Sequence, residues 1–170
     1  MNTSLKMVKA ARATAMRSKP LRSALEDWYK KKGCCPFPEE TSFIRWVERL
    51  ADYVAGHFHD EGLVTEKNIV EGLKVQAIGD KLALRLAKKA ARAGYETDTN
   101  CYIEEGVVFA NVWIASDSFE KSEKRADGIA AEFRKAGYSA ELWVDEEDDR
   151  ACTVNAQIDF KLYVKNGGQK

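Results

Sequence analysis

The sequence predicts an α+β protein in which a helical N-terminal part precedes a duplicated helix–strand–strand unit. Ala93-Gly94-Tyr95 and Ala136-Gly137-Tyr138 each close a stretch with helical period, and each precedes two extended stretches joined by a polar turn. Residues 150–165 alternate between apolar and polar side chains, which is typical of a long strand packed on one face. We therefore expect a four-stranded antiparallel sheet with two helices on one face.

The composition is that of a folded intracellular protein. Of the 170 residues, 45% are hydrophobic and 10% aromatic. No apolar run reaches the roughly 18 residues of a membrane span, so no membrane partner is expected. The four cysteines are scattered and no secretory signal peptide precedes them, which predicts reduced thiols and a cytoplasmic location.

Residues 1–79 are predicted to form a helical region of about four helices. The first 37 residues of this region have a net positive charge. We expect helices near 4–17, 20–32, 39–62 and 65–79, the last ended by Gly79. No acidic residue occurs before Glu26. The candidate nucleic-acid-binding residues are Lys6, Lys9, Arg12, Arg17, Lys19, Arg22, Lys30, Lys31 and Lys32.

This basic segment has three interpretations. In the first, its charges dock on the protein's own acidic residues within 38–80. In the second, they contact nucleic acid or an acidic partner, and in the third the segment is a mitochondrial transit peptide. The first keeps the segment within the fold, whereas the second makes it a binding site.

Residues 80–165 are predicted to form a pseudo-symmetric α-β-β-α-β-β domain, followed by a flexible tail at 166–170. Asp80 is expected to cap the first helix. Alternation places one set of strand residues inward, on the helix side: Thr99, Cys101, Ile103, Val108, Ala110, Val112, Ile114, Leu142, Val144, Cys152, Val154, Ala156, Ile158, Phe160, Leu162 and Val164. The opposite face carries Tyr102, Phe109, Trp113, Trp143 and Tyr163 among Asn111, Asn155 and Gln157.

Aromatic side chains on an open sheet face need an explanation, because exposed apolar patches usually mark a contact. In one interpretation the N-terminal helices, with Trp28, Phe43 and Trp46, cover the face. The alternatives are a protein-binding face and a platform on which unpaired bases stack.

The turn between the last two strands contains the longest acidic run, Asp145, Glu146, Glu147, Asp148 and Asp149. It lacks the glycine and the spaced glutamate of a calcium loop, so we interpret it as an exposed turn or as a contact for a basic partner.

No catalytic or metal motif is present. Adjacent Cys34 and Cys35 match no zinc spacing, and the histidines stand only at His57 and His59. The sequence therefore predicts no metal, no cofactor and no catalytic residue, and an enzyme would need an unrecognised site near His57.

Residues 82–145 resemble a known family. The shared pattern is a helix ending in Ala93-Gly94-Tyr95, a hairpin turn at Glu104-Glu105-Gly106, a helix ending near Gly137 and a strand carrying Trp143. It is similar to that of the RraB-like inhibitors of ribonuclease E. This resemblance implies a non-catalytic protein that binds an RNA-degrading enzyme and modulates it.

The first functional hypothesis is therefore a non-enzymatic intracellular regulator or inhibitor that binds another macromolecule, foremost a protein. It would use the outer aromatics Tyr102, Phe109, Trp113 and Trp143, the acidic run 145–149, or both. The alternative is nucleic-acid binding through the basic residues of 6–32. No residue pattern indicates an oligomeric state.

Overall fold

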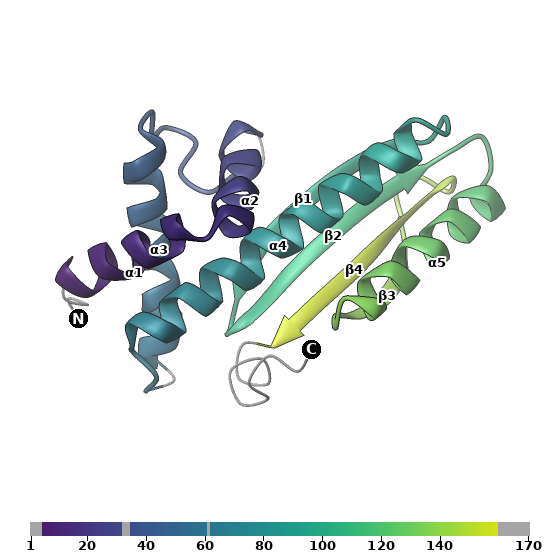
Figure 1. Cartoon of the computed structure of the whole chain (residues 1–170). Coiled ribbons are helices and arrows are strands. Elements are labelled where there is room, and N and C mark those ends of the chain that lie inside the picture. The colour runs from purple at the N-terminus through teal and green to yellow at the C-terminus, as the bar shows by residue number, and fades with distance from the viewer. Residues whose placement is uncertain (1–4, 32–34, 61, 160–170) are drawn as a thin grey trace.

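The computed structural model describes residues 5–31, 35–60 and 62–159, and it confirms the α+β class (Figure 1). The elements in chain order are α1 (Leu5–Arg17), α2 (Lys19–Lys30), α3 (Phe43–Asp60), α4 (Glu66–Ala91), β1 (Glu96–Glu104), β2 (Val107–Ala115), α5 (Phe119–Lys135), β3 (Ser139–Val144) and β4 (Ala151–Asp159). No described helix is long and apolar enough to cross a bilayer. The predicted inward residues Phe160, Leu162 and Val164, and the tail at 166–170, lie outside the described residues.

The sheet is antiparallel with strand order β1-β2-β4-β3. Helix α4 covers β1 and β2, while α5 covers β3 and β4, so both helices lie on one face (Figure 1). The register pairs Val112 with Thr99 on one side and with Val154 on the other, which places all three on the same face. All three are buried, so the predicted inner face is confirmed there. Val144, which pairs with Cys152, also points to this face but is exposed.

Each Ala-Gly-Tyr sequence forms the same helix end. Gly94 and Gly137 adopt φ angles of 89° and 90°, in the left-handed region that favours glycine. The N–H groups of Tyr95 and Tyr138 then bond back to the carbonyls of Ala90 and Phe133, at 3.3 and 3.1 Å. This is the Schellman pattern, which satisfies carbonyls that a helix end leaves unpaired. The repeated sequence therefore reflects a repeated cap that turns the chain into a strand.

The two helices predicted around Gly79 are one continuous helix, α4, of 26 residues. The prediction that Gly79 ends a helix and that Asp80 caps the next is wrong. A glycine inside a helix costs about 1 kcal/mol relative to alanine, but packing offsets that cost here. The Tyr138 hydroxyl lies 2.8 Å from the place of a Cβ on residue 79, so only glycine allows this approach. The boundary predicted between residues 79 and 80 thus falls in the middle of α4.

The other helix boundaries differ less from the prediction. Helix α2 ends at Lys30, and Lys32 lies outside the described residues. Helix α3 begins at Phe43 rather than at Glu39, because the Ser42 carbonyl accepts the first helical hydrogen bond, from the Trp46 N–H at 2.8 Å.

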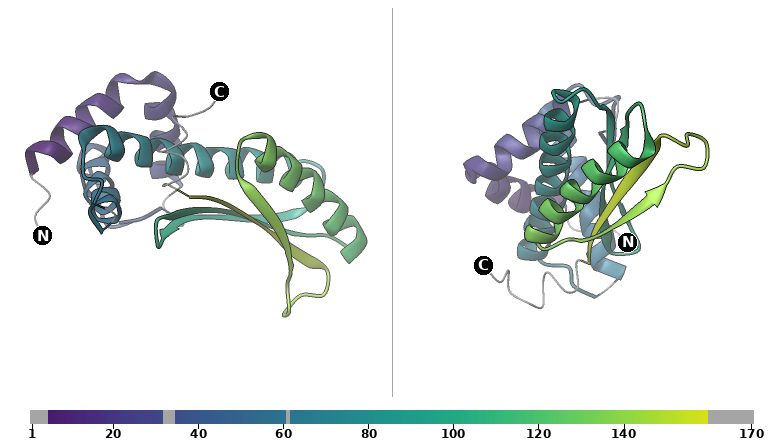
Figure 2. Two further views of the ribbon diagram at one scale, coloured as in Figure 1. Left: turned by 90° about the horizontal axis from the view of Figure 1, so that it is seen from below. Right: turned by 90° about the vertical axis from the view of Figure 1, so that its right-hand side faces the viewer.

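The N-terminal helices do not cover the outer face of the sheet. Helices α1 and α3 pack on the first half of α4 and α2 packs near its middle, where Asp27 meets Lys81, beside one end of the sheet (Figures 1 and 2). Their aromatic residues pack on one another, with the rings of Trp28 and Trp46 at 5.6 Å in an edge-to-face arrangement. The interpretation that these helices cover the outer aromatics is therefore wrong.

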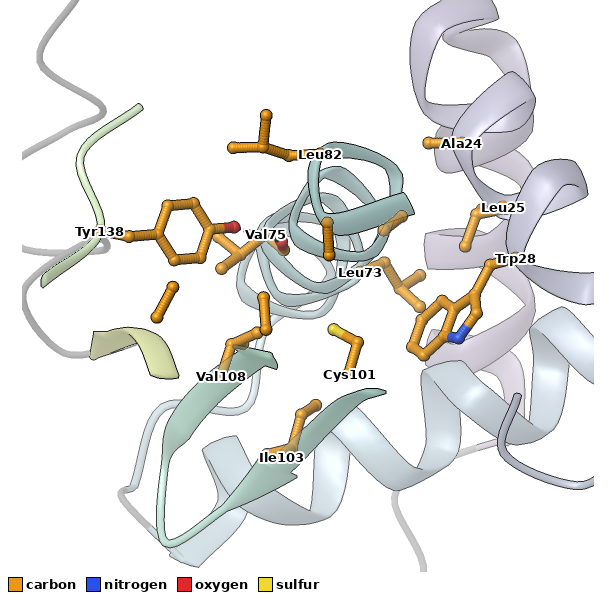
Figure 3. Packing of buried hydrophobic residues seen from close by; sticks show 14 of the residues in the cluster. Ala24, Leu25, Trp28, Leu73, Val75, Leu82, Cys101, Ile103, Val108 and Tyr138 are labelled. Carbon is orange, nitrogen blue, oxygen red and sulfur yellow. Dashed lines mark hydrogen bonds between the residues drawn. The ribbon is translucent and has the colours of Figure 1, made fainter. Parts of the chain in front are cut away.

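Helix α4 joins the two halves of the core. Viewed along its axis in Figure 3, it has α2 with Trp28 on one side and Tyr138 on another, while Cys101, Ile103 and Val108 of the sheet lie below. All of these residues belong to one continuous buried cluster. The chain accordingly has a single core that spans the helical part and the sheet.

Candidate functional site

The outer sheet face consists of the side chains of the four strands that point away from α4 and α5. The register brings Asp98, Trp113, Thr153 and Trp143 into one row across the sheet. In the same way, Tyr102 lies opposite Phe109, and their rings stack at 4.9 Å with an interplanar angle of 13°. The described strands therefore unite Tyr102, Phe109, Trp113 and Trp143 on one surface, whereas Tyr163 lies outside the described residues.

The two tryptophans of this face have different environments. Trp113 is half-buried and its indole N–H donates to Asp145 Oδ2 at 2.9 Å. Trp143 is 54% exposed, and the neighbouring Val144 is 63% exposed. Trp113 thus contributes to the local structure, while the Trp143 ring is free for contact with a partner.

Amide side chains form a second row across the face. Asn100, Asn111, Asn155 and Glu141 lie side by side in the register. Asn155 is only 5% exposed, and the Oδ1 atoms of Asn111 and Asn155 have no hydrogen-bond donor in the described part of the chain. A hollow of about 190 Å³ lies above the row, between Asp98, Asn111 and Trp113. Both Oδ1 atoms are buried, so they are not open to a donor outside the chain.

All charged side chains on the outer face of the four described strands are negative. Its carboxylates are Glu96, Asp98, Glu104, Glu141 and Asp159. Within the four described strands, no Lys or Arg points to this side. Such a surface repels phosphate groups, which argues against the interpretation that unpaired bases stack here.

The acidic run divides into turn-forming and projecting residues. Hydrogen bonds from the Trp113 indole and from the N–H groups of Glu147 and Asp148 lower the pKa of Asp145. Asp148 pairs with Arg150 at 3.1 Å, which likewise lowers its pKa. Glu146, Glu147 and Asp149 are exposed at the tip. Asp145 therefore connects the turn to the aromatic face, and the tip adds negative charge beside it.

The basic residues predicted to bind nucleic acid do not form one patch. Arg12 pairs with Glu48 of α3 at 3.0 Å, and Arg22 pairs with Glu26 of its own helix at 2.9 Å. Lys31 points inward, with its ammonium 3.8 Å from Asp80 and hydrogen-bonded to Thr99. Lys6, Lys9, Arg17, Lys19 and Lys30 are exposed, and Lys32 lies outside the described residues.

The structure reveals a concentrated positive surface elsewhere. Of the predicted nucleic-acid-binding residues, Lys30 lines it. A groove of about 660 Å³, here called the basic groove, runs between α2 and α4. Its lining residues are Asp27, Lys30, Lys81, Leu84, Arg85, Lys88, Lys89 and Arg92. The spacing of positions 81, 85, 88 and 92 places them along one side of a helix. This spacing is the feature of the sequence from which the groove could have been predicted.

A buried polar cluster lies where α2, α4 and β1 meet. Gln76 and Asp80 are fully buried on α4. In the described part of the chain, neither side chain finds a hydrogen-bond partner. Burial, together with the nearby Asp80 carboxylate, raises the pKa of the Cys101 thiol. A raised pKa keeps Cys101 protonated, which makes it a poor nucleophile.

His57 lies on α3, beside Tyr53. Its ring packs edge-on against Tyr53 at 4.8 Å, and burial lowers its pKa. Across residues 5–31, 35–60 and 62–159, no group of His, Cys, Asp and Glu is arranged to hold a metal ion.

Comparisons of the chain with protein-family models, with curated proteins and with solved structures give no match.

Proposed function

We propose that the protein is a non-enzymatic regulator that binds another protein on its outer sheet face, and that the bound segment is cationic. One observation carries the proposal: the N-terminal helices leave this face uncovered, although it presents aromatic rings and carboxylates. The resemblance of residues 82–145 to the RraB-like inhibitors favours the same class of activity.

The chemistry of the face selects the partner. Arginine and lysine side chains bind over the faces of tryptophan rings and pair with carboxylates. Trp143 and Glu141 lie two residues apart on the same side of β3 and supply both interactions.

The test uses two fluorescently labelled synthetic peptides, one alternating arginine with valine and one with glutamate in place of arginine. We expect fluorescence anisotropy to detect binding of the arginine peptide only, with an affinity that falls as salt is added. Trp143→Ser and Glu141→Lys should each weaken binding about tenfold or more, since exposed aromatic anchors dominate such interfaces. Because Trp143 is largely exposed, circular dichroism should show both variants folded.

The matched control is Glu123→Lys, which makes the same charge change on the exposed side of α5. It should bind the arginine peptide as the natural sequence does. Equal binding by all variants, or equal affinity for the two peptides, would contradict the proposal. If the arginine peptide binds as expected, a protein partner captured from cell extract is tested against Trp143→Ser, Glu141→Lys and Glu123→Lys in the same way.

A further inference from the structure

We infer that the basic groove between α2 and α4 is a second binding site, and that it binds the phosphate backbone of a nucleic acid. The site is separate from the proposed protein-binding face. Helix α4 lies on the inner side of the sheet, so its solvent-facing side and the outer sheet face point in opposite directions (Figure 2). One ligand can therefore bind without blocking the other.

The charges of the groove are largely uncompensated. Lys81 pairs with Asp27 at 3.6 Å and donates to Ser23 at 3.2 Å. Among the described residues, no ion pair within 4.0 Å involves Lys30, Arg85, Lys88, Lys89 or Arg92, and all five are exposed. On the α5 side, the pKa of Glu132 is lowered first by a hydrogen bond from Lys135 and further by Arg85 and Lys89, so this carboxylate offsets part of the charge of those two cations. A concentration of unpaired cations is unfavourable unless an anion neutralises it.

The fold itself does not require three of these cations, Arg85, Lys88 and Lys89. Helix α5 covers the second strand pair as the C-terminal half of α4 covers the first, and both end in the same Ala-Gly-Tyr cap. When the two caps are aligned, Arg85, Lys88 and Lys89 correspond to Gly128, Ala131 and Glu132. Lys81 and Arg92 correspond to Lys124 and Lys135, so it is at positions 85, 88 and 89 that packing on the sheet does not explain the positive charge of α4.

The lining indicates which anion binds. No aromatic side chain among the described residues lines the groove, so it offers bases no described surface on which to stack. The cations instead extend over residues 81–92, about 16 Å of helix, which is long enough to meet several successive phosphates. Recognition would then depend on the backbone rather than on base sequence.

The experiment measures binding of a labelled nucleic-acid duplex of mixed sequence to the full chain by fluorescence anisotropy. The test variant is the double substitution Arg85→Gln and Lys88→Gln. The control is Lys6→Gln and Lys9→Gln, which removes the same charge from exposed positions of α1. The exchange Arg85→Lys and Lys88→Arg keeps the charge and serves as a conservative variant.

We expect the groove variant to bind at least tenfold more weakly. Its plot of log affinity against log salt should become shallower by about two, because each lost phosphate contact removes about 0.9 from the slope. The α1 control, the conservative variant and Trp143→Ser should bind as the natural sequence does. The last of these separates this inference from the proposed function.

Three results would overturn the inference. The first is undetectable duplex binding at about 50 mM salt, where phosphate contacts are strong. The second is an equal loss in the groove and α1 variants, which would indicate only diffuse charge attraction. The third is equal affinity for polyglutamate, which would assign the groove to an acidic protein.

Discussion

At the scale of single residues, Asp80 is the most informative side chain. It is fully buried in the middle of α4, and among the described residues it forms one ion pair, with Lys31 at 3.8 Å. Desolvation raises the pKa of its carboxyl group to about 6; Lys31 opposes the shift, and Asp27 adds to it. A buried carboxylate with one distant partner destabilises the fold when it is ionised.

Replacement of Asp80 by asparagine should therefore change how stability depends on pH. In the unfolded chain the carboxyl group ionises near its ordinary pKa of 3.8, but in the fold it ionises near 6. Between these values the folded state holds one more proton, so the free energy of unfolding falls by about 3 kcal/mol as pH rises. Asp80→Asn should match the natural sequence near pH 4 and exceed its stability at pH 7. Urea titrations at the two pH values measure the difference, and an equal change in both proteins would contradict the assignment.

At the scale of elements, local periods predicted the strands and missed the contacts between distant segments. Alternation identified Cys101, Val112 and Val154 as inward because neighbouring residues in a strand point to opposite faces. The prediction that Gly79 ends a helix is wrong because the residue that requires a glycine there is Tyr138. Tyr138 lies far along the chain, and no local pattern reveals its approach. The basic groove was missed for the same reason, since it joins Lys30 of α2 to the cations of α4.

The crossing of α3 over α4 depends on another close approach, at Gly72. A Cβ at this position would lie 2.7 Å from Phe58 Cε2 and nearer still to Val54 Cγ1, both in the core. Gly72→Ala should lower the free energy of unfolding by about 1–3 kcal/mol, because overpacking outweighs the better helix propensity of alanine.

The matched control for Gly72 is Gly56→Ala in α3. Nothing lies within 4 Å of a Cβ at residue 56, so alanine should raise the free energy of unfolding by up to about 1 kcal/mol. Chemical denaturation of both variants provides the measurement. Equal stabilisation by the two substitutions would show that α3 and α4 do not pack this closely.

At the scale of the whole molecule, α4 makes the helical part and the sheet one structure. Its 26 residues extend about 39 Å, and helices α1, α2 and α3 as well as strands β1 and β2 pack on it. The fold also separates charge, with an acidic sheet face on one side and the basic groove on the other, although the net charge is zero. A rigid connection between the two sites would hold a bound protein and a bound nucleic acid at a fixed distance.

This shared helix predicts that the described residues unfold as a single cooperative unit. Core amides of α3 and of β2 should exchange hydrogen with the same free energy and the same dependence on denaturant, because neither part can unfold while α4 stays intact. Gly72→Ala, although it lies at the α3–α4 contact, should then lower the protection of β2 as much as that of α3. Hydrogen exchange followed by mass spectrometry measures both segments in one experiment. A loss of protection confined to α3 would instead mean that the helical part opens on its own, without the sheet.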